Sequence, residues 1–367
     1  MNEKKVRFGV VGLGNIAQVA VLPAFEHASE LCDLVALVSH DEKKRTELRK
    51  EYDVEHVGSY DDLERVLREA AVDAAYIALP NSQHREYTER CAHAGVHVLC
   101  EKPMAMTAED CEAMIEVCRD NGVKLMIAYR LHFESANLHA IEIAHSGRIG
   151  ELRYFSSAFG QQVREGDIRT RAEVGGGALF DMGVYCLNAA RYLFRDEPEE
   201  VLAIQSAGHD PRFQGVDETT SAILRFPGDR LAQFTASQGS ADVDEYRIVG
   251  TEGDLRVEPA YTYYGELLHH LTIGGETKTQ RFDKSDQFAP ELLHFAKCIR
   301  DDVEPEPSGE EGLADVRVLE AMAESARTGA PVKLAPFART RRPGLELETR
   351  RPAVEQPKVV HAPSPTK

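Results

Sequence analysis

Apolar and polar positions follow different patterns in the two halves of this chain. Up to about residue 130, short and nearly continuous apolar runs alternate with longer amphipathic segments. Such runs are typical of strands buried on both faces, and the segments between them are typical of helices that cover a sheet. The expected strands are Val6–Val11, Leu34–Ser39, Ala74–Leu79, His97–Cys100 and Leu125–Ala128. This half is predicted to be a doubly wound parallel sheet of the nucleotide-binding type.

The pattern changes after residue 130. From about residue 200 to residue 282, short runs of strand-like sequence are separated by turn sequences. Hairpin turns are expected at Pro227-Gly228 and Gly253-Asp254. Helices are expected at Asn137–His145, Ala289–Ile299 and Gly312–Arg327. The fold class is therefore α/β in the first half, followed by an α+β domain with a mainly antiparallel open sheet.

The last segment, residues 338–367, fits neither pattern. It carries seven Lys/Arg and three Asp/Glu, a net charge of +7 − 3 = +4, and prolines recur along it. The segment is expected to be a flexible or extended tail. Its positive charge suggests that it lies along an acidic surface of its own or of a neighbouring subunit. The predicted divisions of the chain are therefore 1–130, 131–337 and 338–367.

Composition narrows the class of protein. The formal net charge is −18, which argues against nucleic acid or an anionic membrane as the main partner. No apolar segment approaches the roughly 20 residues that span a bilayer, and the N-terminus lacks the layout of a signal peptide. The seven cysteines form no C-x-x-C pair, which suits a reducing cytoplasm. We expect a cytoplasmic protein.

One stretch, CAHAGVHVLC, resembles the spacing of zinc ligands through Cys91, His93, His97 and Cys100. However, His93 falls at a predicted helix end, and His97 and Cys100 fall on a predicted strand. Alternation along that strand places His97 and Cys100 on opposite faces. We therefore expect local packing here and no metal site.

A glycine-rich turn follows the first predicted strand. Gly12-Leu13-Gly14-Asn15-Ile16-Ala17 matches the G-x-G-x-x-[GA] pattern between a strand and a helix. Gly12 permits the tight turn, Gly14 lets the backbone approach a pyrophosphate, and Ala17 allows close helix–strand packing. Because a helix N-terminus attracts phosphate, we expect Gly12, Gly14, Asn15 and Ile16 to bind a dinucleotide.

The end of the second strand indicates which dinucleotide. NAD sites commonly place an acidic residue there for the ribose hydroxyls. Here the strand ends in Ser39, and Lys43, Lys44 and Arg45 follow. A hydroxyl with nearby cations suits a 2′-phosphate, so NADP is favoured. Asp41 keeps NAD open as the alternative.

Two more strand ends bring polar groups to the same edge of the sheet. Ligands of open α/β sheets bind at the carboxyl ends of the strands. Pro103 restricts Lys102 to an extended conformation and allows a cis peptide bond. An ammonium held there can stabilise negative charge that develops on a reacting oxygen, and it can lower the pKa of a nearby phenol. The candidate residues at these two ends are Leu79, Pro80, Asn81 and His84, and Glu101 and Lys102.

The second half contains one comparable cluster, GGGALFDMGVYCLN. Asp181 and Tyr185 lie four positions apart, on one face of a predicted helix that begins near Gly175. Gly183 lies between them and is expected to let a flat ring approach. A carboxylate, a phenol and the Lys102 ammonium form a proton-transfer set suited to oxidising an alcohol.

Together these motifs resemble the glucose–fructose oxidoreductase, inositol dehydrogenase and rhizopine-catabolism family, Gfo/Idh/MocA. The resemblance runs from about Val6 to Val332 and rests on GLGNIA, LPNSQH, CEKPMA, the YR pair at 129–130, GGGALFDMGVYCLN and PSGEEGLADVRVLEAMAESARTGAPV. Many relatives have histidine at the position of Tyr185. The tyrosine form is most similar to glucose–fructose oxidoreductase and to NADP-linked aldose and dihydrodiol dehydrogenases.

The resemblance implies roles for individual residues. Lys102 would be the catalytic lysine that touches substrate and nicotinamide, Tyr185 the acid/base, and Asp181 the group that orients the substrate hydroxyl. The resemblance also implies cofactor contacts for Ser39 and Lys44, at the NADP phosphate, and for Arg130 and Arg169.

One departure concerns the residue before Arg169, where relatives commonly have an aromatic side chain and this chain has Ile168. A second departure is that the N-terminal arm of glucose–fructose oxidoreductase, which helps to retain NADP, has no counterpart here. Exchangeable NADP is therefore expected rather than permanently held NADP.

The resulting hypothesis is an NADP-dependent oxidoreductase that transfers a hydride between nicotinamide and a sugar or polyol. Residues 1–130 would form the Rossmann domain, and 131–337 would bind substrate and form a homodimer or homotetramer. One alternative is a transhydrogenase that retains its cofactor, oxidising one sugar and reducing another. Another is a non-catalytic regulatory sensor of the same fold that binds NADP and a sugar.

Overall fold

The computed structural model describes residues 4–339 and 341–366. Met1 and Lys367, at the outer ends of the predicted first domain and tail, lie outside the described residues, as does residue 340 of the tail. The chain forms two compact units, each drawn from separate stretches of sequence. The first unit comprises Met1–Arg130, Ser285–Gly312 and Arg350–Ser364, and the second comprises Leu131–Lys284, Leu313–Thr349 and Pro365–Lys367.

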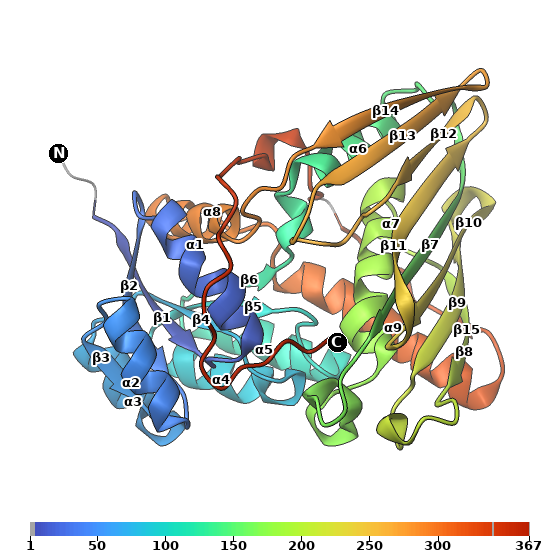
Figure 1. The fold of residues 1–367 in the computed structure, drawn as a ribbon. Helices are drawn as coiled ribbons and strands as arrows, with labels where there is room; N and C mark the ends of the chain where they lie inside the picture. Colours follow the sequence, from blue (N-terminus) through green and yellow to red (C-terminus); the bar gives the residue numbers. More distant parts are fainter. Residues whose placement is uncertain (1–3, 340, 367) are drawn as a thin grey trace. The chain divides into compact units, whose positions relative to one another are not determined.

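The first unit is built on a six-stranded parallel sheet in the order β3-β2-β1-β4-β5-β6 (Figure 1). Its direction of winding reverses between β1 and β4, which creates the crevice where ligands of such folds bind. The predicted doubly wound sheet is confirmed. The strands are β1 (Val6–Val11), β2 (Cys32–Val38), β3 (His56–Gly58), β4 (Ala74–Ile77), β5 (His97–Glu101) and β6 (Leu125–Ala128).

Helices cover both faces of this sheet (Figure 1). They are α1 (Leu22–His27), α2 (Glu42–Glu51), α3 (Leu63–Glu69), α4 (His84–His93), α5 (Ala108–Asp120) and α8 (Ala289–Arg300). The last of these comes from far along the sequence. It packs on α1, β1 and β2, and Phe295 lies against Phe8 in the core, with ring centroids 6.5 Å apart. The division therefore differs from the predicted continuous ranges, because burying the apolar face of α8 returns the chain to the first unit.

The second unit is built on a nine-stranded sheet in the order β14-β13-β12-β11-β7-β10-β9-β8-β15. All its neighbours are antiparallel except β7 and β10, so the predicted, mainly antiparallel α+β architecture is confirmed. The strands are β7 (Leu152–Gln162), β8 (Glu200–Ser206), β9 (Thr219–Phe226), β10 (Arg230–Ser237), β11 (Gly239–Gly250), β12 (Gly253–Val257), β13 (Leu267–Ile273), β14 (Glu276–Phe282) and β15 (Val332–Lys333).

One face of this sheet is covered by helices, including α6 (Ser135–His145) and α7 (Val184–Phe194). The helix α9 (Gly309–Thr328) belongs to this unit from Leu313 onward. Along β9, buried residues alternate with residues that are open to solvent, as expected when only one face meets a core. The face opposite the helices is thus left exposed within this unit.

Two turn predictions have different outcomes. Pro227-Gly228 does connect the paired strands β9 and β10. The prediction for Gly253-Asp254 is wrong, because both residues already belong to β12 and the turn lies before them. At Gly253, an added Cβ would lie 2.3 Å from the Thr272 carbonyl oxygen, so this glycine serves close packing between strands.

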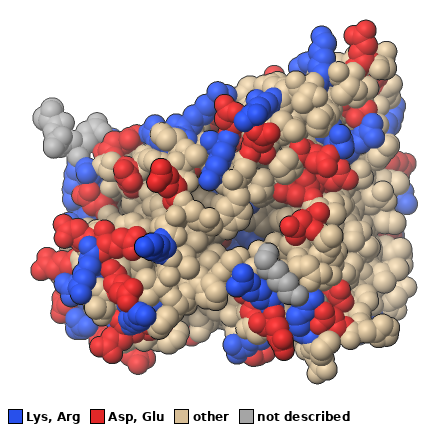
Figure 2. All heavy atoms as spheres, viewed as in Figure 1, with Lys and Arg blue, Asp and Glu red and all other residues tan. Residues whose placement is uncertain are grey.

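The tail contains one short helical turn, Leu345–Leu347, and is otherwise without regular secondary structure over its described residues. Its arginines pair with carboxylates of the same chain: Arg342 with Glu197 at 2.7 Å in the second unit, and Arg351 with Glu30 in the first. The basic tail thus lies along acidic groups of its own chain. On the face shown in Figure 2, acidic and basic side chains are interspersed over the surface.

Within residues 4–339 and 341–366, no helix combines the length and apolar character needed to cross a membrane. All seven cysteines are buried.

Candidate active site

The two positions of the first turn, Gly12 and Gly14, are glycine for different local reasons. Gly12 has a φ of 97°, and a Cβ added to it would lie 2.4 Å from the Ala78 carbonyl oxygen. Only glycine fits there, because both the backbone conformation and the neighbouring strand exclude a side chain. At Gly14, by contrast, no heavy atom of the described chain would lie within 4 Å of an added Cβ. Gly14 therefore keeps its backbone open to a ligand, as a pyrophosphate requires.

The helix after this turn begins with a π-helical turn, Ala17–Val21, whose N-cap is Ile16. Its backbone N–H groups are therefore presented next to Gly14, where an anion is favoured. The residues present fit a dinucleotide on this evidence: an open glycine backbone at a helix start, at the switch point of a parallel sheet.

The end of β2 supports NADP over NAD. Asp41, the acidic residue that left NAD open, is the N-cap of α2: its Oδ1 accepts from the Lys44 N–H at 3.1 Å. Its Oδ2 lies 3.0 Å from His361 Nδ1. The Lys44 N–H and the His361 contact hold the pKa of Asp41 at about 2. This carboxylate is thus already paired within the protein, and the binding of a 2′-phosphate by Ser39 and Lys44 stays a prediction.

Burial affects both Ser39 and Lys44. Ser39 is buried, and its Oγ accepts from the Asp41 N–H at 3.2 Å. Burial lowers the pKa of Lys44, and the Asp41 carboxylate partly offsets this effect. A bound phosphate dianion would favour the charged ammonium further.

The ends of β4 and β5 are tied together by His84. Its ring is fully buried, with Nε2 2.9 Å from the Leu79 carbonyl oxygen and Nδ1 3.0 Å from that of Pro103. This geometry lets His84 position the ends of β4 and β5, and the cofactor contact expected for it stays a prediction. Asn81 is the first residue of a 3₁₀ turn whose N-cap is Pro80.

Glu101 and Lys102 stand at the carboxyl end of β5, and the Lys102–Pro103 peptide is cis. Tyr76, from the buried centre of β4, donates to Glu101 Oε1 at 2.8 Å. Burial raises the pKa of Glu101, although the charge of Lys102 counteracts it. The Glu101 carboxyl is thereby held against the sheet, next to the lysine.

Beneath this edge lies a buried polar group that the sequence did not reveal. Glu291 of α8 is fully buried, and neither carboxyl oxygen has a hydrogen-bond partner among the described residues. Burial, reinforced by the Glu101 carboxylate, raises its pKa well above the ordinary value. Arg130 is also buried, and it donates to Gln287 from the same stretch of chain. No local pattern signals this cluster, because α8 reads as an ordinary amphipathic helix.

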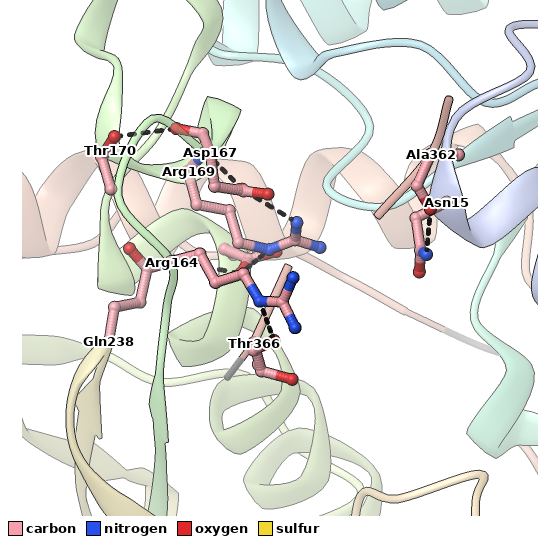
Figure 3. A network of polar contacts seen from close by, with 9 residues as sticks. Asn15, Arg164, Asp167, Arg169, Thr170, Gln238, Ala362 and Thr366 are labelled. Atoms are coloured by element: carbon pink, nitrogen blue, oxygen red, sulfur yellow. Dashed lines mark hydrogen bonds and ion pairs between the residues drawn. The ribbon is translucent and has the colours of Figure 1, made fainter. Parts of the chain in front are cut away.

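In the second unit, Asp181 is held by two side chains, Arg169 and Gln238, both of which are labelled in Figure 3. Arg169 Nε donates to its Oδ2 at 2.8 Å, and Gln238 Nε2 donates to the same oxygen at 3.0 Å. Arg169 also contacts Asp167 Oδ1 at 3.2 Å. Burial opposes the charge of Arg169, but the carboxylates of Asp181 and Asp167 outweigh it and raise its pKa.

Gln238 is a residue that the sequence analysis missed. It is fully buried at the junction of β10 and β11, and its Oε1 has no hydrogen-bond partner among the described residues. A glutamine between two strands gives no periodic or spacing signal, so only the fold reveals that it meets Asp181.

Tyr185 is partly exposed and lies in a cluster of aromatic rings. Its ring meets that of Phe159 edge-on, with centroids 5.6 Å apart, and lies 5.9 Å from that of Tyr261. The flat ring that approaches Gly183 is that of Phe234: an added Cβ would lie 3.3 Å from it, so Gly183 lets its helix pack on the sheet.

The glycine run before this helix folds the loop back on itself. An added Cβ at Gly176 would lie 2.5 Å from the Arg169 carbonyl oxygen, and one at Gly177 would lie 2.2 Å from Asp217 Oδ1. The helix thus starts later than predicted, with a π-helical turn at Leu179–Gly183. Such turns are frequent at functional sites.

In the described part of the chain, no group of three or more His, Cys, Asp or Glu residues is arranged to hold a metal ion. The structure thus divides the predicted site residues between its units. The first carries the glycine turn, Ser39, Lys44, Glu101, Lys102 and Arg130, and the second carries Arg169, Asp181 and Tyr185.

Comparison with known proteins gives matches to two family models and to characterised relatives. Residues 6–129 match the model of an oxidoreductase family with an NAD-binding Rossmann fold, and residues 138–256 match the GFO/IDH/MocA C-terminal domain. D-xylose 1-dehydrogenase [NADP(+)] of Haloarcula marismortui is 34% identical, over 90% of this chain and 94% of its own length.

Two solved structures are similar throughout. An aldose-aldose oxidoreductase from Caulobacter crescentus, complexed with glycerol, is 36% identical, has a TM-score of 0.85, and is matched over 90% of this chain and 100% of its own. A 3-ketoreductase from Actinomadura kijaniata, in complex with NADP and TDP-benzene, is 29% identical, has a TM-score of 0.81, and is matched over 88% of this chain and 98% of its own.

Proposed function

Because the chain belongs to the Gfo/Idh/MocA oxidoreductase family, we propose that it transfers a hydride between NADP and a CH–OH carbon of a sugar or polyol. Xylose, aldoses and NADP are specified in the names of relatives that align with almost the whole chain. The cofactor would supply the hydride acceptor or donor. The protein's own residues must then bind the substrate and move the hydroxyl proton.

The observation that carries this proposal is the network around Asp181. A carboxylate held through one oxygen by both Arg169 and Gln238 is fixed in orientation. Held in this way, the carboxylate is suited to orient a substrate hydroxyl. Tyr185 follows on the same helical segment, and its phenol can act as a general acid or base.

Three residues have catalytic roles in this proposal. Tyr185 takes the proton from the substrate hydroxyl during oxidation and returns it during reduction. Lys102 stabilises the negative charge that develops on that oxygen, as a held ammonium does in a site shielded from water. Asp181 orients the hydroxyl that reacts.

The cofactor would be held by residues of the first unit. Gly12, Gly14, Asn15 and Ile16 would receive the pyrophosphate at the helix start, and Ser39 and Lys44 the 2′-phosphate. The nicotinamide half would meet the ends of β4 and β5 at Leu79, Pro80, Asn81, Glu101 and Lys102, with Arg130 and Arg169 also contributing.

The test is Lys102→Met. We expect turnover of every accepted aldose to fall at least 1,000-fold, because the charge is lost while the chain length is kept. NADPH binding, followed by its fluorescence, should change less than about tenfold. Lys50→Met, at an exposed position of α2, is the matched control and should leave both unchanged. Undiminished turnover in Lys102→Met would disprove the role of this lysine.

A second candidate activity is aldose–aldose transhydrogenation, in which the reduced cofactor formed by one sugar reduces another. It is favoured by the 36% identity with the aldose-aldose oxidoreductase. Purified protein would then show NADPH fluorescence after one aldose is added, and a second sugar would quench it without added NADP. A regulatory sensor, the third alternative, would bind sugar and NADP but give no absorbance change at 340 nm with any aldose.

We also propose that the exposed face of the large sheet pairs with a second copy of the chain. Large apolar side chains lie open there on neighbouring strands: Ile204 is 72% exposed and Ile223 49%, and Leu202 lies directly opposite Ile223. Such an apolar surface commonly marks a protein interface. Ile204→Asp with Ile223→Asp should convert a dimer or tetramer to a smaller species in light scattering. An unchanged mass would place the interface elsewhere.

The buried cysteines suit a reducing compartment, so we propose a cytoplasmic location. Fractionation of cells that express the tagged chain tests this directly.

A further inference from the structure

The end of the chain runs along the candidate cofactor site of the first unit. Residues 358–363, here called the strap, lie beside the helix that starts after the glycine turn, and the dark red segment in Figure 1 shows this course. The strap forms no helix or strand. Its position is nevertheless fixed by several specific hydrogen bonds.

Gln18 makes the most complete contact with the strap. Its Nε2 donates to the Val360 carbonyl oxygen at 3.0 Å, and its Oε1 accepts from the Val360 N–H at 2.7 Å. Gln18 thus pairs with one strap residue in the way that a neighbouring strand would. Gln18 itself is almost wholly buried, and its Nε2 also donates to the Leu13 carbonyl oxygen at 2.9 Å. The amide thus joins the glycine turn to the strap.

Two further contacts lie on either side of this one. Asn15 Nδ2 donates to the Ala362 carbonyl oxygen at 2.9 Å (Figure 3). His361 Nδ1 lies 3.0 Å from Asp41 Oδ2. Ala362 is buried, and His361 has a φ of 48°, a conformation that is uncommon for residues other than glycine. Such a conformation persists only where the surroundings hold the chain in place.

The partners of the strap mark two separate parts of the cofactor site. Asn15 belongs to the glycine turn that would receive the pyrophosphate, and Gln18 follows it in the first turn of the helix. Asp41 follows Ser39, at the place proposed for the 2′-phosphate. The strap therefore joins the two points between which the adenosine half of NADP would lie.

The strap leaves the space next to Gly14 open. Above Gly14, no heavy atom of the described chain lies within 4 Å of an added Cβ. Its hydrogen bonds to Asn15 and Gln18 are made with side chains, which leaves the backbone of the glycine turn to a ligand. This arrangement distinguishes a cover over the bound cofactor from a segment that replaces it.

From these contacts we infer that the strap is part of the NADP site and holds the cofactor in place, so that NADP leaves only when residues 358–363 detach. This inference rests on the proposed function for the identity of the ligand. It also changes the expectation of freely exchanging NADP, because a retaining segment is present at the other end of the chain. Slow exchange would favour the transhydrogenase among the candidate activities, since that reaction needs no release of cofactor.

The test compares the full chain with a chain that ends at Gln356. Each is loaded with NADPH, and the dissociation rate is measured by fluorescence after excess NADP is added. We expect the shortened chain to release NADPH at least ten times faster and to lose most of its cofactor on desalting. An unchanged rate would refute the inference, and tighter binding by the shortened chain would show that the strap competes with the cofactor.

A point variant covers the case in which the shortened chain fails to fold. Val360→Pro removes the N–H that donates to Gln18, and we expect it to raise the release rate about three- to tenfold. Glu355→Pro is the matched control, since this exposed residue lies outside the strap, and it should behave as the unaltered chain. Equal rates for the two proline variants would contradict the inference.

These outcomes are separate from a failure of the proposed function. If the NADP-binding part of that function is wrong, neither the full chain nor the shortened chain will bind NADPH. If only the inference is wrong, both chains will bind NADPH and release it equally fast.

Discussion

The buried carboxyl of Glu291 gives the sharpest prediction about stability. It is fully buried, and neither oxygen has a hydrogen-bond partner among the described residues. Burial, with the nearby Glu101, raises its pKa well above the ordinary value. Glu291→Gln keeps the shape and removes the ionisation. We expect this variant to be more stable than the unaltered chain at neutral pH.

The sign of the pH dependence follows from linkage. In the unfolded chain Glu291 loses its proton near pH 4.3, whereas in the folded chain it keeps the proton to higher pH. The folded state therefore binds more protons above about pH 4.3, and stability falls as the pH rises toward the folded pKa. Each unit by which the folded pKa exceeds the unfolded one costs about 1.4 kcal/mol once both states are ionised.

The Glu291→Gln variant removes only part of the free-energy cost of burying this side chain. The glutamine amide still lacks partners, and an unsatisfied buried polar group costs roughly 1–3 kcal/mol, so only the ionisation penalty is removed. We expect the variant's advantage to be near zero at pH 4.5 and to grow by about 1.4 kcal/mol for each pH unit over which only the folded chain keeps the proton. Thermal unfolding by scanning fluorimetry between these pH values measures it.

A matched control is Glu116→Gln, at an exposed position of α5 in the same unit, which should shift the midpoint little at any pH. The reasoning is refuted if Glu291→Gln is less stable than the unaltered chain at pH 8. That result would mean that the ionised carboxylate is stabilised in the folded protein.

Two further pairs of variants test the site. Gly12→Ala should destabilise the protein by at least about 2 kcal/mol, because its Cβ would lie 2.4 Å from a carbonyl oxygen at a φ of 97°. Gly14→Val should fold normally but weaken NADPH binding at least 100-fold. Unfolding midpoints measure the first effect and NADPH titration the second. Arg169→Lys should lower kcat/KM at least tenfold, since a lysine cannot contact Asp181 and Asp167 as the planar guanidinium does. Unchanged kcat/KM would remove Arg169 from the site. Gln238→Leu should give a similar loss, because it also releases the Asp181 carboxylate.

Local sequence predicted the first unit well, because its chemistry is carried by short motifs. The glycine turn, the end of β5 and the strands around them each depend on residues that are close in sequence. The parallel sheet adds the rest, since it brings the carboxyl ends of its strands to one edge. The positions of Glu101 and Lys102 at the end of β5 could therefore be predicted without long-range information.

Other features depend on contacts between residues far apart. Gln238 meets Asp181 only because the strands of the large sheet order themselves as they do, and α8 joins the first unit only because its apolar face fits against α1. A pattern of apolar positions shows that such a face must be buried, but it does not show against what. For the same reason the sequence did not show that the ring approaching Gly183 belongs to the sheet residue Phe234.

The strap is the clearest case of this limit. A proline-rich basic segment without an apolar period gives no reason to expect a fixed position, and its composition is typical of disorder. Its bonds to Gln18 and Asn15 use backbone groups of the strap, so they leave no trace in its side chains. The sequence signal was on the other partner: Gln18 is a buried amide on an otherwise apolar helical turn, and a buried amide requires hydrogen-bond partners. A polar residue at such a position next to a cofactor motif is therefore a reason to search the rest of the chain for the segment that satisfies it.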